Sequence, residues 1–295
     1  MMKANHVQIE LTNRCNLACV ECPHRMMKRK QEDMKQPVFQ KILQIIEPMK
    51  PQTVIVHKDG EPLLHPYFDS LFSDICQLLP YTKVDVYTNA YHLTPALFEK
   101  LGEARRNNIF WFLVTIHGHD YKGEPYDLRK PSENVLTCLD IIKAKGWKGI
   151  EFIISSHKTD QVSQQSMKMF YDYWTSIKQG HRALRDVHAN TNINPWSQRI
   201  KMKEGMVHYQ ACPYADGAHL FIGVTGNVLP CCVDLEEEIV FGNIMTDDLN
   251  EIEARRQSFY EIMRENKERT FELCQKCLSL EPTEKTTTRL ITRKG

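Results

Sequence analysis

A short run of cysteines near the N-terminus constrains this chain more than any other feature. Cys15, Cys19 and Cys22 form a Cys-x3-Cys-x2-Cys run directly after a strand-like segment, 7–12. Thiolates are soft ligands that select iron–sulfur clusters or zinc. A [4Fe–4S] cube has four irons, and the next cysteine is as distant as Cys76. We therefore predict a cluster with one open iron that can bind and reduce a small molecule. A zinc site is the alternative, although zinc favours paired spacings.

Composition supports the interpretation of the cysteines as metal ligands. The chain has 295 residues and ten cysteines, and residues 1–6 contain no apolar stretch of the signal-peptide type. We expect a cytoplasmic protein, in which thiols stay reduced. The longest strongly apolar run, 109–116, is too short to span a bilayer. The net charge of +1 gives no reason to expect nucleic-acid or membrane binding.

Helical and strand-like patterns alternate through the first two thirds of the chain. Apolar residues at helical spacing, such as Phe39, Ile42 and Ile46, separate short β-branched or aromatic segments. The predicted strands are 6–12, 53–57, 83–88, 108–116, 150–155 and 185–190. Thr94 and Ser132 are predicted to cap the helices that follow them. This alternation predicts an α/β fold with a parallel sheet and helices on its outer face. Ligands of such folds bind at the carboxyl ends of the strands, where the cysteine run lies.

The cysteine run resembles the cluster motif of the radical SAM superfamily. The resemblance implies a partial (β/α)6 barrel and a [4Fe–4S] cluster whose open iron chelates S-adenosylmethionine. It also implies reductive cleavage to a 5′-deoxyadenosyl radical, hydrogen abstraction from substrate, and a reductant such as flavodoxin or ferredoxin. The family usually has an aromatic residue just before the third cysteine, and Glu21 stands there in this chain.

A second motif follows the second predicted strand. Gly60 and Glu61 resemble the end of the family's Gly-Gly-Glu motif, which holds the amino group of S-adenosylmethionine, and Asp59 replaces the first glycine. A glycine permits close backbone approach, and a carboxylate accepts hydrogen bonds from an ammonium group. The side chain of Asp59 is expected to contact either this cofactor or the substrate. The alternative is a plain turn before a helix.

The resemblance implies further contacts at the ends of later strands. The candidate cofactor contacts are Thr88, Asn89, Thr115, Ser155 and Trp196. His117 replaces the usual aspartate after the fourth strand and is a candidate catalytic residue with a substrate-specific role. An ordinary strand-end histidine and a packed core indole are the alternatives for His117 and Trp196. Weaker candidates are His119, Tyr121 and His188.

A second set of cysteines lies in the last third of the chain. Its members are Cys212, Cys231, Cys274 and Cys277. A hairpin is expected over 221–229 and a charged helix over 249–267. The pattern Gly-x4-Cys followed by a distant Cys-x2-Cys resembles the shortened SPASM, or Twitch, domain, which implies an auxiliary [4Fe–4S] cluster. Four thiolates saturate a cluster, which can then carry an electron, although they also suit structural zinc. Cys232 is a spare ligand, an inert thiol or a hydrogen-atom donor.

These motifs predict a domain organisation and a function. We expect a radical SAM barrel over 1–204, an auxiliary cluster domain over 205–280 and a loose tail over 281–295. The expected reaction is two-electron oxidation of an alcohol on a polar small molecule. Epimerisation with Cys232 as donor, peptide modification and nucleoside rearrangement are alternatives. The early first strand leads us to expect no N-terminal peptide-recognition domain. A non-catalytic metal-binding or electron-carrier protein would not explain Gly60 and Glu61. No pattern predicts the oligomeric state.

Overall fold

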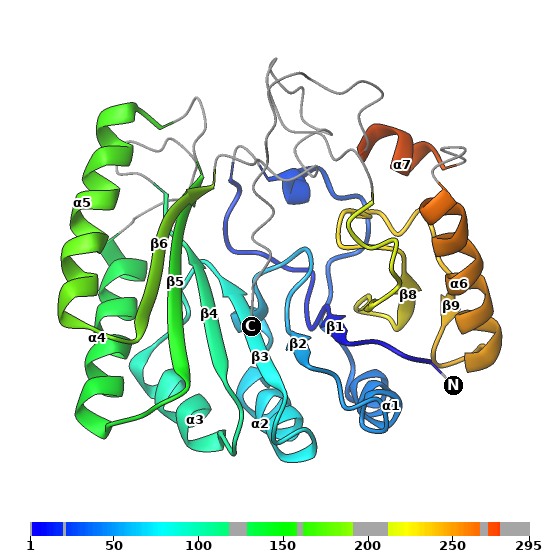
Figure 1. Ribbon diagram of the computed structural model, residues 1–295, viewed down its shortest axis with the longest axis horizontal. Helices are drawn as coiled ribbons and strands as arrows, with labels where there is room; N and C mark the ends of the chain where they lie inside the picture. Colours follow the sequence, from blue (N-terminus) through cyan, green and yellow to red (C-terminus); the bar gives the residue numbers. More distant parts are fainter. Residues whose placement is uncertain are drawn as a thin grey trace.

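The computed structural model describes residues 2–19, 22–117, 129–157, 162–190, 212–265 and 271–277. Within these ranges the strands form one sheet of nine, in the order β6-β5-β4-β3-β2-β1-β7-β8-β9 (Figure 1). The first part of the sheet consists of β1 (His6–Ile9), β2 (Thr53–Ile55), β3 (Lys83–Thr88), β4 (Phe110–Thr115), β5 (Ile150–His157) and β6 (Leu184–Asn190). Neighbours among these strands all pair in parallel, which confirms the predicted α/β class.

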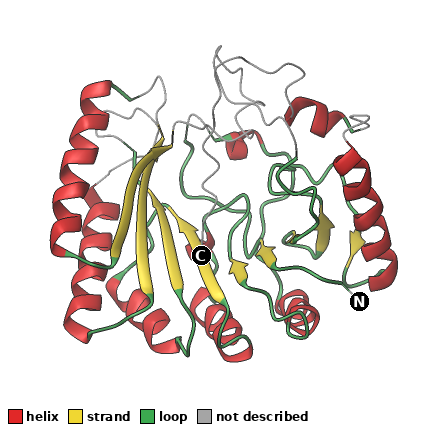
Figure 2. Ribbon diagram, in the orientation of Figure 1, coloured by secondary structure: helices red, strands yellow, loops and turns green. Residues whose placement is uncertain are grey.

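A helix follows almost every one of these strands and returns the chain to the start of the next. The helices are α1 (Gln36–Ile46), α2 (Phe68–Leu78), α3 (Pro95–Ala104), α4 (Arg129–Lys145) and α5 (Gln164–Gly180), with short 3-10 turns η1 (Pro23–Met26) and η2 (Pro62–Leu64). Figure 2 shows the α-helices along the outer side of the curved sheet. The predicted cap of α3 is confirmed, because Thr94 accepts a hydrogen bond from the N–H of Leu97 at 3.2 Å. The predicted cap of α4 is wrong: the helix begins at Arg129, so Ser132 lies within its first turns.

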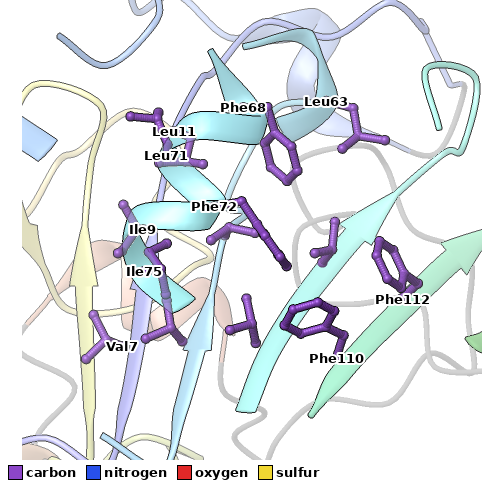
Figure 3. Close-up of a cluster of buried hydrophobic side chains, with 14 of the residues drawn as sticks. Val7, Ile9, Leu11, Leu63, Phe68, Leu71, Phe72, Ile75, Phe110 and Phe112 are labelled. Atoms are coloured by element: carbon purple, nitrogen blue, oxygen red, sulfur yellow. The ribbon is translucent and has the colours of Figure 1, made fainter. Parts of the chain in front are cut away.

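The outer face of the sheet carries the core. Apolar residues of β1 and β4 pack against one face of α2, and Figure 3 shows the cluster that they form. The ring of Phe72 on α2 meets the ring of Phe110 on β4 edge-on, with centroids 4.7 Å apart. Because side chains alternate along a strand, the neighbouring residues point to the opposite, inner face. On β3 these inner residues are Lys83, Asp85 and Tyr87, so the inner face is polar and aromatic.

The C-terminal part continues the same sheet. Strand β7 (His219–Ile222) pairs in parallel with β1, and β8 (Asn227–Leu229) and β9 (Gly242–Asn243) add an antiparallel edge. The predicted hairpin is therefore present as β7 and β8, followed by α6 (Leu249–Glu265) and α7 (Glu272–Cys277). The pairing of β7 with β1 has no signal in the sequence. The predicted boundary between residues 204 and 205 and the predicted tail lie outside the described residues. In the part of the chain that the structure describes, no helix is both long and apolar enough to cross a membrane.

Candidate active site

The loop that carries the first cysteines rests on Gly60. The N–H of Glu61 donates a hydrogen bond to the carbonyl of Arg14 at 2.8 Å. A Cβ atom on Gly60 would lie 2.5 Å from that same carbonyl oxygen and 2.7 Å from the carbonyl of Thr12. Such distances are too short for any side chain, so Gly60 is needed for this close approach. The motif after β2 is therefore the seat of the cysteine loop.

Further hydrogen bonds hold the loop from its other sides. Asn89, at the end of β3, donates from Nδ2 to Oδ1 of Asn16 at 2.9 Å. Asp33 accepts from the hydroxyl of Thr12 at 2.7 Å and forms an ion pair with Arg14 at 2.8 Å. The loop is thus tied to the carboxyl end of β3 through Asn89, and through Asp33 to the segment that follows the loop itself. Cys15, Cys19 and Cys22 are all partly buried and none of them forms a disulfide.

One sulfur atom in each cysteine set, that of Cys15 and that of Cys212, receives backbone hydrogen bonds. Burial raises the pKa of the Cys15 thiol to about 11 and the charge of Glu61 adds to this, while the N–H groups of Leu17 and Asn16 lower it. Burial also raises the pKa of Cys212, which accepts hydrogen bonds from the two N–H groups of Tyr214 and Ala215. Amides that donate to sulfur suit cluster-bound thiolates, so these residues fit an iron–sulfur cluster.

The described residues contain no group of three His, Cys, Asp or Glu side chains placed around a single metal ion. A cube does not require such a group, because each thiolate binds a different iron. The side chain of Cys277, at the end of α7, lies outside the described residues, while Cys274 is partly buried on the same helix.

Glu61 joins the end of β2 to the end of β3. Its Oε1 accepts hydrogen bonds from the hydroxyl of Thr88 at 2.7 Å and the N–H of Leu63 at 3.1 Å, and its Oε2 accepts from the N–H of Asn89 at 2.8 Å. Burial raises the pKa of Glu61 to about 7, although these hydrogen bonds act in the opposite direction. The structure therefore brings the predicted residues Glu61, Thr88 and Asn89 together, with most of the carboxylate already engaged by the protein.

Asp59 belongs to a buried network of charges at the ends of β1 and β2. Its Oδ2 accepts from Nζ of Lys58 and, at 2.9 Å, from Nη2 of Arg29. Arg29 also pairs with Glu10 at 2.9 Å and Glu237 at 2.7 Å. Three carboxylates thus face two cations, which leaves one carboxylate in excess. Oδ1 of Asp59 is buried and, within the described residues, has no hydrogen-bond partner.

Two carboxylates of this network, Glu10 and Asp59, have pKa values that are shifted in opposite directions. Burial alone would raise the pKa of Glu10, but the charges of Lys58 and Arg29 and the N–H of Val224 lower it to about 2. Burial raises the pKa of Asp59 to about 7. The charges of Lys58 and Arg29 lower this pKa, and repulsion from Glu10 offsets part of their effect. Asp59, unlike Glu10, can therefore gain or lose a proton near neutral pH.

The neighbouring cysteines Cys231 and Cys232 have different surroundings. Burial raises the pKa of the hydroxyl of Tyr260 on α6, and the charges of Cys231 and Cys212 both raise it further. The sulfur of Cys232 lies 3.3 Å from the hydroxyl of Tyr214. Burial raises the pKa of Cys232, while the charge of Lys58 lowers it and that of Asp59 raises it. Cys231 thus shares its surroundings with Cys212, another predicted ligand, whereas Cys232 lies beside the network at β2.

The inner face of the sheet holds the other predicted residues. Thr115 and Ser155 are register partners on β4 and β5, and their hydroxyl oxygens lie 3.5 Å apart. His117 is buried two residues beyond Thr115, and His188 lies opposite Ser155 on β6. Trp196, His119, Tyr121 and Glu21 lie outside the described residues.

Sequence reasoning missed Glu10, Arg29, Lys58 and Glu237. A weak signal was available for two of them: Glu10 ends an apolar strand, and Lys58 stands between a β-branched strand and Gly60. Arg29 and Glu237 lie in charged stretches that look like ordinary solvated surface. Only the folded chain shows that these four residues meet Asp59.

Comparison with known families identifies the chain. The family model of the radical SAM superfamily matches residues 9–161, which is more than half of the chain. The chain therefore belongs to the radical SAM superfamily. A second model, the SPASM iron–sulfur cluster-binding domain, matches residues 212–278. The predicted cofactors follow from these two domains: a [4Fe–4S] cluster with S-adenosylmethionine, and auxiliary iron–sulfur binding. The protein is an enzyme of this superfamily.

Relatives of known structure share the architecture. An S-adenosyl-L-methionine-dependent 2-deoxy-scyllo-inosamine dehydrogenase from Niallia circulans is 23% identical over 278 residues, covering 92% of this chain and 91% of its own. The crystal structure of BtrN with AdoMet and 2-DOIA matches with a TM-score of 0.64 at 18% identity, covering 95% of each chain. Streptococcus suis SuiB bound to S-adenosylmethionine matches with a TM-score of 0.59 at 16% identity, covering 87% of this chain and 68% of its own. These likenesses confirm the partial barrel.

Proposed function

We propose that this radical SAM enzyme oxidises a secondary alcohol of a polar small molecule by two electrons. When bound, the first cluster and S-adenosylmethionine supply the 5′-deoxyadenosyl radical that removes a hydrogen atom, and the auxiliary cluster accepts the remaining electron. The relative from Niallia circulans, a dehydrogenase of 2-deoxy-scyllo-inosamine, supports this class of reaction and substrate.

One observation carries the proposal more than any other. The segment just after Cys231 lies against the carboxyl ends of β1 and β2. Nζ of Lys58, after β2, donates to the carbonyl of Asp234 at 2.8 Å, and Arg29, which pairs with Glu10 after β1, donates to the carbonyl of Leu235. The cysteine loop is seated on the same strand ends through Gly60. A substrate between the two cysteine sets could give up a hydrogen atom on one side and an electron on the other.

In this proposal the strand-end residues bind the cofactor. Gly60 and Glu61 hold the cysteine loop and face the amino group of S-adenosylmethionine, while Thr88 and Asn89 orient Glu61. The adjacent hydroxyls of Thr115 and Ser155 are placed to bind its polar groups. His117 and Trp196 are proposed to contact the substrate and the cofactor respectively. The metal ligands are Cys15, Cys19, Cys22, Cys212, Cys231, Cys274 and Cys277.

Asp59 is proposed as the proton acceptor. Oxidation of a secondary alcohol to a ketone releases a hydrogen atom, an electron and the hydroxyl proton. Oδ1 of Asp59 has no described partner, and the pKa of this carboxyl is raised by burial to about 7. A base with a pKa near the working pH is suited to proton transfer. Asp59 would therefore take the proton as the electron leaves for the auxiliary cluster.

A radical epimerase is the second candidate, since the thiol of Cys232 lies beside Lys58 and Asp59 rather than with Cys231 and Cys212. Such a thiol could return a hydrogen atom to the substrate radical, and an electron from the reductant with a proton would then restore the thiol from the thiyl radical. Incubation in deuterated water separates the two reactions, because an epimerase places solvent deuterium on the reacting carbon and leaves the alcohol intact. A dehydrogenase gives a ketone, and Cys232→Ser leaves its formation in place.

The proposal is tested with anaerobically reconstituted protein, S-adenosylmethionine and dithionite. We expect about eight irons per chain, as two cubes of four require. We expect slow release of 5′-deoxyadenosine without substrate, and none from Cys15→Ala. Addition of 2-deoxy-scyllo-inosamine and related cyclitols should increase this release for a substrate and yield its ketone. Equal release from Cys15→Ala would contradict the assigned site. Reduced flavodoxin or ferredoxin is expected to replace dithionite.

A further inference from the structure

Five charged residues meet in one buried network between the two cysteine sets. They are Glu10, Arg29, Lys58, Asp59 and Glu237. Only 1% of the Lys58 side chain and 12% of the Arg29 side chain are exposed, and the side chains of Glu10 and Asp59 are fully buried. Buried charges are expensive, and an apolar cluster of the same volume would often be as stable. The network is therefore poorly explained by stability alone.

The network connects three parts of the chain that are far apart in sequence. Nε of Arg29 donates to the carbonyl of Leu235 at 2.5 Å, while its terminal nitrogens reach Glu10, Asp59 and Glu237. Glu10 follows β1, Asp59 follows β2, and Leu235 and Glu237 follow Cys231 and Cys232. The guanidinium of Arg29 thus joins the ends of β1 and β2 to the 234–237 segment.

Other bonds reinforce the same junction. Glu236 accepts from the N–H groups of Lys28 at 2.9 Å and Arg29 at 3.1 Å. Lys58 donates to the carbonyl of Asp234 at 2.8 Å. Every residue from Asp234 to Glu237 is therefore bonded to the segment after Cys22 or to the end of β2.

Arg29 is suited to setting a distance because its donors form a planar, rigid fork. All its nitrogens are engaged, with partners around the edge of the guanidinium. A movement of the 234–237 segment relative to the cysteine loop would break several of these bonds at once. Lysine at this position would keep the charge but lose the fork.

We propose that Arg29 is a positioning residue that fixes the distance and orientation between the two iron–sulfur clusters. It acts through Glu10 and Asp59 on one side and through Leu235 and Glu237 on the other. The inference rests on the proposed function only in requiring that both cysteine sets hold clusters. Its consequence is that substrate meets the radical source and the electron acceptor at a set separation.

The test measures the separation of the clusters directly. In the dithionite-reduced holoenzyme, the magnetic dipolar interaction between the two clusters is recorded by pulsed electron paramagnetic resonance. In the wild type, we expect a single narrow distribution of the distance between the clusters. In Arg29→Met, we expect this distribution to become broader or to shift. Arg29→Lys should also broaden it, because one ammonium cannot reach the same partners. Arg25→Met is the matched control: Arg25 is exposed in the same segment, and we expect the wild-type distribution.

A milder variant covers the case in which Arg29→Met does not retain both clusters. Glu237→Gln removes only the charge that pairs with Nη1 of Arg29 and should broaden the distribution to a smaller degree. A merely structural role would lower the melting temperature of these variants and leave the distance unchanged, which would overturn the inference. A wild-type protein that binds only about four irons per chain, enough for one cube, would instead contradict the proposed function.

Discussion

At the scale of single residues, Gly60 has the sharpest requirement. Its missing Cβ allows the carbonyls of Arg14 and Thr12 to approach the turn after β2. We expect Gly60→Ala to displace the cysteine loop and to lower the rate of 5′-deoxyadenosine release by about 100-fold, the usual cost of moving a reacting group by about 1 Å. The matched control is Gly180→Ala at the end of α5, where an added Cβ meets nothing within 4 Å. Wild-type activity in Gly60→Ala would show that the loop is seated differently.

Glu61 predicts a dependence of stability on pH. Burial raises the pKa of this carboxyl from 4.5 to about 7, so between these values the folded protein holds a proton that the unfolded chain has lost. Stability therefore falls as the pH rises from 4.5 to 7, by up to about 1.4 kcal/mol per pH unit. Glu61→Gln cannot ionise, so in protein free of S-adenosylmethionine its melting temperature should gain on that of the wild type over this range. A constant difference would mean that Glu61 stays ionised when folded.

At the scale of elements, α6 is fastened by Arg256. This buried guanidinium donates to the carbonyls of Gly217 at 2.8 Å, His219 at 3.0 Å and Lys3 at 2.9 Å, so the helix is tied to β7 and to the N-terminal segment. Arg256→Lys leaves some of these carbonyls without donors, and we expect a loss of at least about 1–3 kcal/mol of stability. Thermal unfolding checks this, with Arg264→Lys, an exposed residue of the same helix, as the control. Similar losses in both variants would show that the buried bonds are not special.

At the scale of the whole molecule, one sheet connects the first cysteine loop with Cys231, while Cys274 and Cys277 of the second set lie on α7. Strand β7 pairs with β1, and the cysteine loop follows β1 directly. Strands β7, β8 and β9 thus extend the sheet of the barrel, and the network around Arg29 joins the 234–237 segment to the ends of β1 and β2. Within the described residues, the part of the chain that matches the SPASM model therefore has no sheet of its own.

Much of the fold was predictable because its signals are local. Each parallel strand and its helix form a repeating unit whose apolar spacing shows in the sequence, and the strand ends place Gly60 beside the cysteine loop. Element limits were less predictable. Strand β1 ends at Ile9 rather than at Thr12, and α4 begins before Ser132, since tertiary contacts decide where pairing and helix formation stop.

The two motifs of this protein, thiolates at cluster spacing and a glycine–carboxylate turn, can be recognised in the sequence because residues close together in the chain form them. What surrounds these motifs depends on how the chain folds. The buried meeting of Arg29, Asp59 and Glu237, the pairing of β7 with β1 and the separate surroundings of Cys231 and Cys232 all depend on contacts between distant segments. Charge and burial at such contacts are properties of the packed molecule, and no local pattern encodes them.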